Sequence, residues 1–292
     1  MTWRYRIYGL ETESEINLGD LPAGDRQVAS DVRIVSGPVP PLSTEASGWL
    51  DVQAGTVSVD LPPSGRFKIE GGTTITVDKA VTGLASLRWR LLGIAFGALL
   101  HQRGVLPLHC TLVSVSGRAI GFLGQSGAGK STLAAHLQAR GHQILVDDVC
   151  AVVSGEPQRL VVEPGHGLLR LWEDASAALG QDVGQPLDPA TTKYEHRIPT
   201  VNRERIVVSA LMELCEGDQI EINPLSAAQR MRLCLEHSYC REVMVDLGGR
   251  GRNLTQCAAV AAAVTGFSLT RPKDLNRMSN VLDLIEQSAA RL

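Results

Sequence analysis

Residues 119–132 of the chain read A-I-G-F-L-G-Q-S-G-A-G-K-S-T, and this stretch decides the fold. Residues 119–123 form an apolar run that is typical of a buried strand. The next residues match the pattern G-x-x-x-x-G-K-[ST] of a phosphate-binding loop: Gly124, Gln125, Ser126, Gly127, Ala128, Gly129, Lys130 and Ser131. A helix is expected over residues 132–140, with Gly141 just past its end. Strand, loop and helix together predict a nucleotide site.

Each part of this loop has a chemical reason to bind phosphate. Its glycines let the backbone turn tightly, so that successive N–H groups point into one concavity. Thr132 opens a helix whose N-terminal dipole faces the same anion. Lys130 is expected to reach the β- and γ-phosphates, and the Ser131 hydroxyl to bind Mg²⁺. The loop therefore predicts ATP and Mg²⁺ as cofactors, although it does not specify the reaction.

The composition favours a globular protein outside the nucleic-acid-binding and membrane classes. The chain has 292 residues, 44% hydrophobic and 20% charged, and this mixture supports a sizeable core. A net charge of −3 gives no basic field for nucleic acid or an anionic membrane. The longest apolar run, residues 91–100, is well short of the roughly 20 residues that span a bilayer. We therefore expect no nucleic-acid partner and no membrane partner.

The cysteines and the N-terminus favour a cytoplasmic protein. Six cysteines are scattered without a C-x-x-C pair, as in a protein with reduced thiols. The first ten residues carry charges and lack the apolar segment of a secretory signal. The sequence leaves open whether copies of the chain assemble as a homo-oligomer.

Two regions are expected along the chain. Residues 1 to about 80 alternate in short runs broken by Gly and Pro, which predicts a small antiparallel β unit. Helical spacing of leucines then predicts a connecting helix over residues 82–102. We divide the chain into a β-rich N-terminal region with this helix, residues 1–104, and a catalytic domain, residues 105–292.

The second region reads as an α/β domain built around the loop. Residues 105–115 and 118–123 predict a hairpin whose second strand leads into the phosphate loop. The remaining expected strands are 143–146, 160–162, 206–214, 219–222 and 242–247, and the remaining expected helices are 173–179, 226–236, 255–264 and one at the C-terminus. Residues 181–199 predict a long loop, and loops of that length are often functional.

Two carboxylates follow the strand at residues 143–146. Asp147 and Asp148 stand at a strand end, where α/β sheets place their chemistry. Neighbouring residues within a strand point to opposite faces of the sheet. If the strand has already ended, one carboxylate can bind Mg²⁺ while the other accepts a proton. The alternative is one metal-side carboxylate plus a helix cap, as in an ordinary ATPase.

Residues 106–286 resemble the HPr serine kinase/phosphorylase family, and in particular its smaller relatives from gene clusters for lasso-type peptides. The similarity rests on His109, residues 124–131, Gly141-His142, Asp147-Asp148, and Gly251-Arg252-Asn253 before an alanine-rich helix. The resemblance implies an HPr kinase-type P-loop fold. It further implies that Asp147 is the proton acceptor, that Asp148 binds Mg²⁺ and that His109 lies beside them. From the residues alone, His109 could equally be a core histidine.

The chain departs from the family pattern in one segment. The family's E-I-R-G-x-G is replaced here by residues 163–167, E-P-G-H-G, which keep Glu163 as an implied metal-side carboxylate but lose the arginine. The resemblance also moves Arg252 and Asn253 toward the substrate side. Lys193 and Arg197 form either a solvated face or a basic loop that closes on the γ-phosphate.

The leading interpretation is an ATP- and Mg²⁺-dependent kinase acting on a serine hydroxyl of a peptide or protein. By resemblance, the acceptor is a lasso-type precursor peptide, held by the N-terminal region or by the 181–199 loop. The alternatives are a nucleotide-gated ATPase or binding module, and a small-metabolite kinase. An ABC-type ATPase is disfavoured, since no L-S-G-G-Q signature is present.

Overall fold

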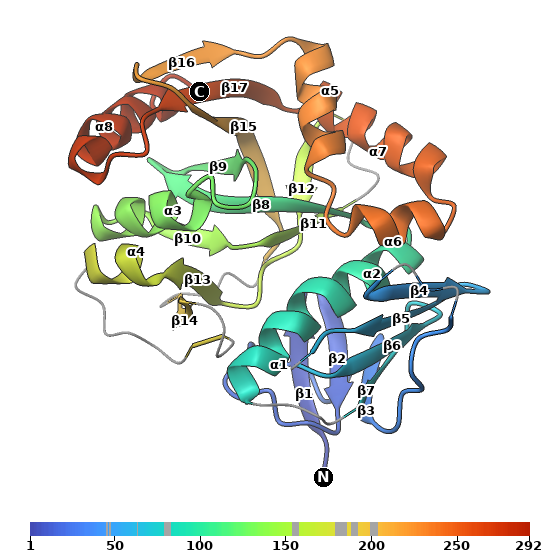
Figure 1. The fold of residues 1–292 in the computed structure, drawn as a ribbon. Helices are drawn as coiled ribbons and strands as arrows, with labels where there is room; N and C mark the ends of the chain where they lie inside the picture. The colour runs from blue at the N-terminus through green and yellow to red at the C-terminus, as the bar shows by residue number, and fades with distance from the viewer. Residues whose placement is uncertain are drawn as a thin grey trace.

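The computed structural model describes residues 1–44, 46, 48–62, 64–78, 83–153, 158–178, 186–187, 192–198 and 204–292. Most of the expected 181–199 loop lies outside these residues, as does the start of the expected 82–102 helix. Figure 1 shows two parts, a blue N-terminal sheet covered by a helix and a larger green-to-red part around a second sheet. Among the described helices, none has the length and apolar character needed to cross a membrane.

The N-terminal part is a seven-stranded sheet with the order β1-β2-β3-β7-β6-β5-β4. Its strands are β1 (Trp3–Ile7), β2 (Leu10–Ser14), β3 (Val32–Ser36), β4 (Leu50–Gln53), β5 (Thr56–Asp60), β6 (Arg66–Glu70) and β7 (Thr74–Asp78). Alternate residues are buried along β5, β6 and β7, as the sequence alternation predicts. The expectation of an antiparallel unit is confirmed for β1-β2 and for β4 to β7. It is wrong at β3, which pairs with both β2 and β7 in parallel, so the sheet is mixed.

The connecting helix packs against this sheet and against the second part. It consists of α1 (Leu84–Arg90), a π-helical segment η1 (Leu91–Ala95) and α2 (Phe96–Gln102). A π-turn leaves a carbonyl without its helical partner, and the buried Tyr8 hydroxyl donates to the Leu92 carbonyl at 2.7 Å. The glycines of this helix face the second part, since a Cβ on Gly93 would lie 2.8 Å from the Tyr239 hydroxyl. The helix therefore joins the two parts, although the division at residue 104 stays a prediction.

The second sheet has eight strands, ordered β10-β8-β11-β12-β15-β17-β16, with β9 paired to β8 and β15. They are β8 (Leu106–Val115), β9 (Arg118–Leu123), β10 (Gln143–Val146), β11 (Val149–Val153), β12 (Leu160–Val162), β15 (Ile206–Glu216), β16 (Glu221–Pro224) and β17 (Thr265–Arg271). Strands β9, β15 and β17 run parallel, so their carboxyl ends meet at one edge. The phosphate loop follows β9 at that edge. The predicted α/β fold class is confirmed.

Helices cover the second sheet, and a separate two-stranded ribbon lies beside it (Figure 1). The helices are α3 (Lys130–Ala139), α4 (Glu173–Ala178), α5 (Ala227–Glu236), α6 (Arg241–Asp246), α7 (Arg250–Ala263) and α8 (Met278–Ala289), with a 3₁₀ turn η2 (Leu275–Arg277). The ribbon pairs β13 (Leu168–Trp172) with β14 (Lys193–Arg197) in antiparallel register. Part of the expected 181–199 loop is therefore a strand.

Two other sequence expectations are wrong in this part. Residues 242–247 were expected as a strand, but Arg241–Asp246 is the helix α6, because a short apolar run suits either structure and here the buried pair is adjacent, Val243 and Met244. The helix α7 begins at Arg250, so Gly251, Arg252 and Asn253 lie within its first turn and do not form a turn before it.

Candidate active site

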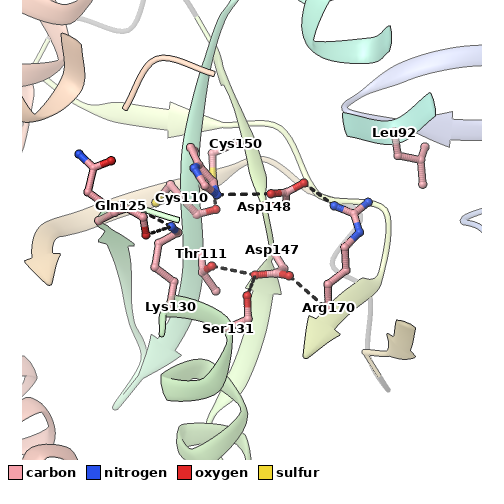
Figure 2. Close-up of polar contacts among 12 residues, drawn as sticks. Leu92, Cys110, Thr111, Gln125, Lys130, Ser131, Asp147, Asp148, Cys150 and Arg170 are labelled. Atoms are coloured by element: carbon pink, nitrogen blue, oxygen red, sulfur yellow. Dashed lines mark hydrogen bonds and ion pairs between the residues drawn. The ribbon is translucent and has the colours of Figure 1, made fainter. Parts of the chain in front are cut away.

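The phosphate loop has the conformation that the motif requires. Gly129 has a φ of 86° and caps the ten-residue helix α3, which begins at Lys130. Two features disfavour a side chain at Gly129. Its φ is unfavourable for L-residues, and a Cβ would lie 2.6 Å from the Arg271 guanidinium. Lys130 is buried and donates to the carbonyls of Gly124, at 2.8 Å, and Gln125, at 3.4 Å (Figure 2). Burial lowers the pKa of the Lys130 ammonium.

The two aspartates point into one pocket because both lie in the turn between β10 and β11. Asp148 has a φ of 74°, and the Val149 N–H donates to the Asp147 carbonyl at 3.0 Å across it. This three-residue turn, rare and strained for a non-glycine residue, interrupts the strand alternation. Asp147 and Asp148 both line the pocket, together with Lys130 and Ser131. The strand has ended before the pair, and this is the condition under which the sequence analysis expects both carboxylates to serve the site.

Asp147 lies against the phosphate loop. Its Oδ1 accepts hydrogen bonds from the hydroxyls of Thr111, at 2.8 Å, and Ser131, at 3.0 Å, and its Oδ2 accepts from the Arg170 backbone N–H at 3.2 Å (Figure 2). Burial, and then the Asp148 charge, raise the pKa of the Asp147 carboxyl. Asp147 is therefore the carboxylate beside Ser131, whose hydroxyl the sequence predicts to bind Mg²⁺. This is the position that the resemblance had given to Asp148.

Asp148 lines the same pocket but lies against Arg170 and His109. Its Oδ2 pairs with the Arg170 guanidinium (Figure 2). Its Oδ1 lies 3.4 Å from the His109 Nε2. Although burial works in the opposite direction, the charges of Arg170 and then His109 lower the pKa of the Asp148 carboxyl to about 2. The two neighbouring carboxylates thus have pKa values displaced in opposite directions, a pattern that separates acid–base roles.

Arg170, Thr111 and Trp172 line the pocket but were missed by the sequence reasoning. Arg170 is 2% exposed, and its Nε and Nη2 are buried without a hydrogen-bond partner among the described residues. One signal could have found it, because it interrupts the apolar run L-L-R-L-W of β13. A lone arginine at a buried strand position is rare unless it is paired. Although the family's arginine is missing from residues 163–167, a guanidinium reaches the pocket from Arg170.

The structure brings only some of the expected residues together. His109 and Lys193 line the pocket with the aspartates. Glu163 does not, since its carboxylate pairs with Arg205 at 3.0 Å. Arg197 pairs with Asp20 of the N-terminal part.

Arg252 and Asn253 lie at a different cavity, of about 270 Å³, beside Gln102 and Gln256. The buried Asn253 amide donates to the Ser238 hydroxyl at 3.0 Å. The sequence analysis expected Arg252 and Asn253 on the substrate side of the phosphate pocket, but the structure has them at this other cavity.

Three buried histidines predict acid sensitivity. Burial lowers the pKa of His109 to about 4, of His166 to about 3 and of His237 to about 4. Between these values and the ordinary pKa near 6.5, the unfolded chain binds protons that the folded chain does not. Stability that is fully present above about pH 6.5 is therefore lost as the pH falls. We expect the calorimetric melting temperature to decrease from pH 7 to pH 5, and less steeply in His237→Gln. A melting temperature that is constant over this range would contradict the assignment.

Comparison with known proteins places the chain near one family. No family model matches it. The HPr kinase/phosphorylase of Geobacter sulfurreducens is 28% identical over 161 residues, which cover 53% of this chain and 45% of that protein. The chain thus matches less than half of this curated relative. Among solved structures, the HPr(Ser) kinase/phosphatase from Coxiella burnetii aligns with a TM-score of 0.34 and 12% identity, over 63% of this chain and 91% of that one. This sequence similarity confirms that part of the resemblance which concerns the HPr kinase/phosphorylases, and the chain is related to them.

Proposed function

We propose that this protein is an ATP- and Mg²⁺-dependent kinase that transfers the γ-phosphate to a serine hydroxyl of a peptide or protein. The observation that carries the proposal is one pocket holding Lys130, Ser131 and both aspartates, with the Ser131 hydroxyl 3.0 Å from Asp147. Phosphoryl transfer needs a phosphate cradle, a metal site and an oriented acceptor. This pocket has a residue for each of them.

The residues present fit Mg²⁺ held jointly with a nucleotide. No group of three or more His, Cys, Asp or Glu side chains is placed to hold a metal within the described ranges. Mg²⁺ is usually bound by one or two protein oxygens, with phosphates and waters completing its shell. Ser131 and Asp147 would supply those oxygens, and the metal would neutralise phosphate charge. Lys130 and the loop N–H groups would hold the phosphates.

Asp148 is the better placed carboxylate for the acceptor hydroxyl. It lines the pocket, pairs with Arg170 and is ionised, whereas Asp147 lies against the phosphate loop, where it accepts hydrogen bonds from three donors. A carboxylate with a pKa of about 2 is a weak base, but the loose transition state of phosphoryl transfer mainly requires orientation of the hydroxyl. His109 is neutral above about pH 4 and lies beside Asp148. We therefore assign the acceptor role to Asp148 and the metal role to Asp147.

The acceptor is proposed to be a serine near the end of a short, largely unfolded peptide. Trp172, which is 43% exposed, lies at the pocket with the Lys193 ammonium 5.6 Å from its ring centroid. A flexible peptide end reaches such a recess more easily than a hydroxyl on a rigid surface. By resemblance to the peptide-cluster kinases, a lasso-type precursor peptide is the first candidate.

The test is to incubate the protein with Mg²⁺ and ATP labelled on the γ-phosphate, with either a serine-containing precursor peptide encoded beside its gene or a folded HPr-type protein. We expect one phosphate on a peptide serine by mass spectrometry. Label on the folded protein or on a metabolite would contradict the peptide acceptor but not the kinase. Label released only as free phosphate would favour a nucleotide-gated ATPase.

Lys130→Ala is the matched loss-of-function variant. A charge-assisted hydrogen bond contributes about 1.5–3 kcal/mol, so nucleotide affinity should fall roughly 10- to 100-fold, and phosphate transfer with it. Lys68→Ala is the control, because Lys68 pairs with Glu70 on the N-terminal sheet at 2.9 Å. Calorimetric titration with Mg²⁺-ADP measures the affinity. Equal affinity in the two variants would contradict the phosphate-loop assignment.

A further inference from the structure

One face of the β13–β14 ribbon carries polar side chains from the catalytic pocket toward the N-terminal part. The register places Arg170 opposite Glu195, and opposite residues of an antiparallel pair project from the same face. The next pair on this face, Trp172 and Lys193, lines the catalytic pocket. On the other side of Glu195, Arg197 forms an ion pair with the N-terminal part. This face of the ribbon therefore touches both the pocket and the N-terminal part.

Four charged side chains on this face and beside it alternate in sign. The Arg170 guanidinium pairs with Asp148 in the pocket (Figure 2). Opposite Arg170, Glu195 pairs with the Arg88 guanidinium of helix α1. Arg88 also donates to the Leu18 carbonyl of the N-terminal part at 3.2 Å. The four charges together connect the carboxylate that we assign to the acceptor with the N-terminal part.

The two inner members of this series, Arg170 and Glu195, are buried and incompletely paired. Their side chains are 2% and 7% exposed. The Nε and Nη2 of Arg170 and the Oε2 of Glu195 have no hydrogen-bond partner within the described part of the chain. Buried donors and acceptors cost free energy when they stay unpaired. Because direct cross-strand neighbours have Cβ atoms only about 4.5–5.5 Å apart, Glu195 is placed to hold the side of the guanidinium that Asp148 does not hold.

The position of Arg170 matters for the proposed reaction because Asp148 depends on it. The Asp148 Oδ2 is held by the guanidinium, while its Oδ1 lies toward His109. A carboxylate that orients an acceptor hydroxyl must itself be oriented, and a displacement of about 1 Å can lower a rate roughly 10²-fold. An arginine side chain has several rotatable bonds, so one ion pair alone leaves it considerable freedom.

We propose that Glu195 is a positioning residue of the kinase: held by Arg88, it fixes the Arg170 guanidinium, which in turn fixes Asp148. The inference rests on the proposed function, because the acceptor role of Asp148 belongs to that proposal. It adds a second layer of residues behind the carboxylate, and it gives the connecting helix a part in the reaction through Arg88.

Glu195→Gln tests the proposal, because glutamine keeps the shape of the side chain and removes its charge. We expect single-turnover phosphate transfer to fall at least about tenfold, while the Kd for Mg²⁺-ADP stays within about twofold of the wild type. Calorimetric titration measures this Kd. Glu13→Gln is the matched control, because Glu13 forms a partly buried ion pair of 2.7 Å with Arg4 in the N-terminal sheet. It should change neither quantity.

The same substitution in an Asp148→Asn background shows whether Glu195 acts through Asp148. A residue that only positions this carboxylate has little further effect once the carboxylate is gone, so the two losses of transfer should not add. Equal losses from Glu195→Gln in the wild-type and Asp148→Asn backgrounds would overturn the proposal. If Asp148→Asn alone leaves transfer unchanged, or if the wild type transfers no phosphate, the proposed function fails first.

A charge swap separates positioning from simple attachment of the ribbon to the helix. Arg88→Glu combined with Glu195→Arg restores an ion pair between α1 and β14 but places a second cation opposite Arg170. We expect denaturant unfolding to show a more stable protein than Arg88→Glu alone, with phosphate transfer still at least about tenfold below the wild type. Transfer at the wild-type rate in the swapped protein would mean that Glu195 only attaches the ribbon, and the positioning role would be wrong.

Discussion

Asp148→Asn is expected to lower phosphate transfer about 10²- to 10⁴-fold, the usual contribution of a positioned acid–base group, while Mg²⁺-ADP affinity stays near that of the wild type. In the proposed mechanism Asp148 orients the acceptor hydroxyl, and the loop hydroxyl of Ser131 contacts Asp147 instead. Asparagine has nearly the same shape, so the loss would come from the charge. Single-turnover transfer and calorimetric titration measure the two quantities separately.

The matched variant is Asp147→Asn, which should mainly raise the Mg²⁺ concentration needed for half-maximal transfer. Its amide oxygen can still accept one hydroxyl but is a poorer metal ligand than a carboxylate. Asp20→Asn is the surface control, because the Asp20 side chain is 77% exposed and forms an ion pair with Arg197. If Asp148→Asn raises the Mg²⁺ requirement and Asp147→Asn does not, the roles return to those that the family resemblance implies.

The parts of the site that are local in sequence could be predicted from it. The phosphate loop requires glycines and a lysine at fixed spacing, and its neighbouring strand and helix follow from an apolar run and helical periodicity. The Asp147-Asp148 pair was found because it follows a buried strand directly. Which aspartate faces the loop could not be read, since this depends on a single turn at Asp148 and on the pairing of β10 with β8.

The parts that depend on tertiary pairing could not be predicted. Arg170 reaches the pocket because β13 pairs with β14 in a separate two-stranded sheet. Glu163 was expected at the metal but lies against Arg205, and nothing in residues 163–167 indicates that direction. Arg252 and Asn253 looked like a turn because glycine is common there, yet helix α7 continues through them.

The second large effect is expected for Arg170→Met. This change removes the buried guanidinium that pairs with Asp148 and leaves the half-buried carboxylate with only the neutral His109 ring beside it. Breaking a buried pair in this way typically costs about 3–5 kcal/mol of folding free energy. Denaturant unfolding measures the loss. Arg205→Met is the control, because Arg205 is 60% exposed in its pair with Glu163 and such pairs contribute about 0–1 kcal/mol.

Arg170→Met should also alter the pH dependence of kcat/KM. Its effect on stability should depend on the charge of Asp148. Arg170 is the main cause that lowers the pKa of Asp148 to about 2, so in Arg170→Met this pKa rises and the acid limb of kcat/KM moves to higher pH. Adding Asp148→Asn removes the unpaired charge, so the double variant should be more stable than Arg170→Met alone. If instead the two losses simply add and the acid limb stays in place, Arg170 acts by packing in β13, and the electrostatic link between this ribbon and the catalytic carboxylate is wrong.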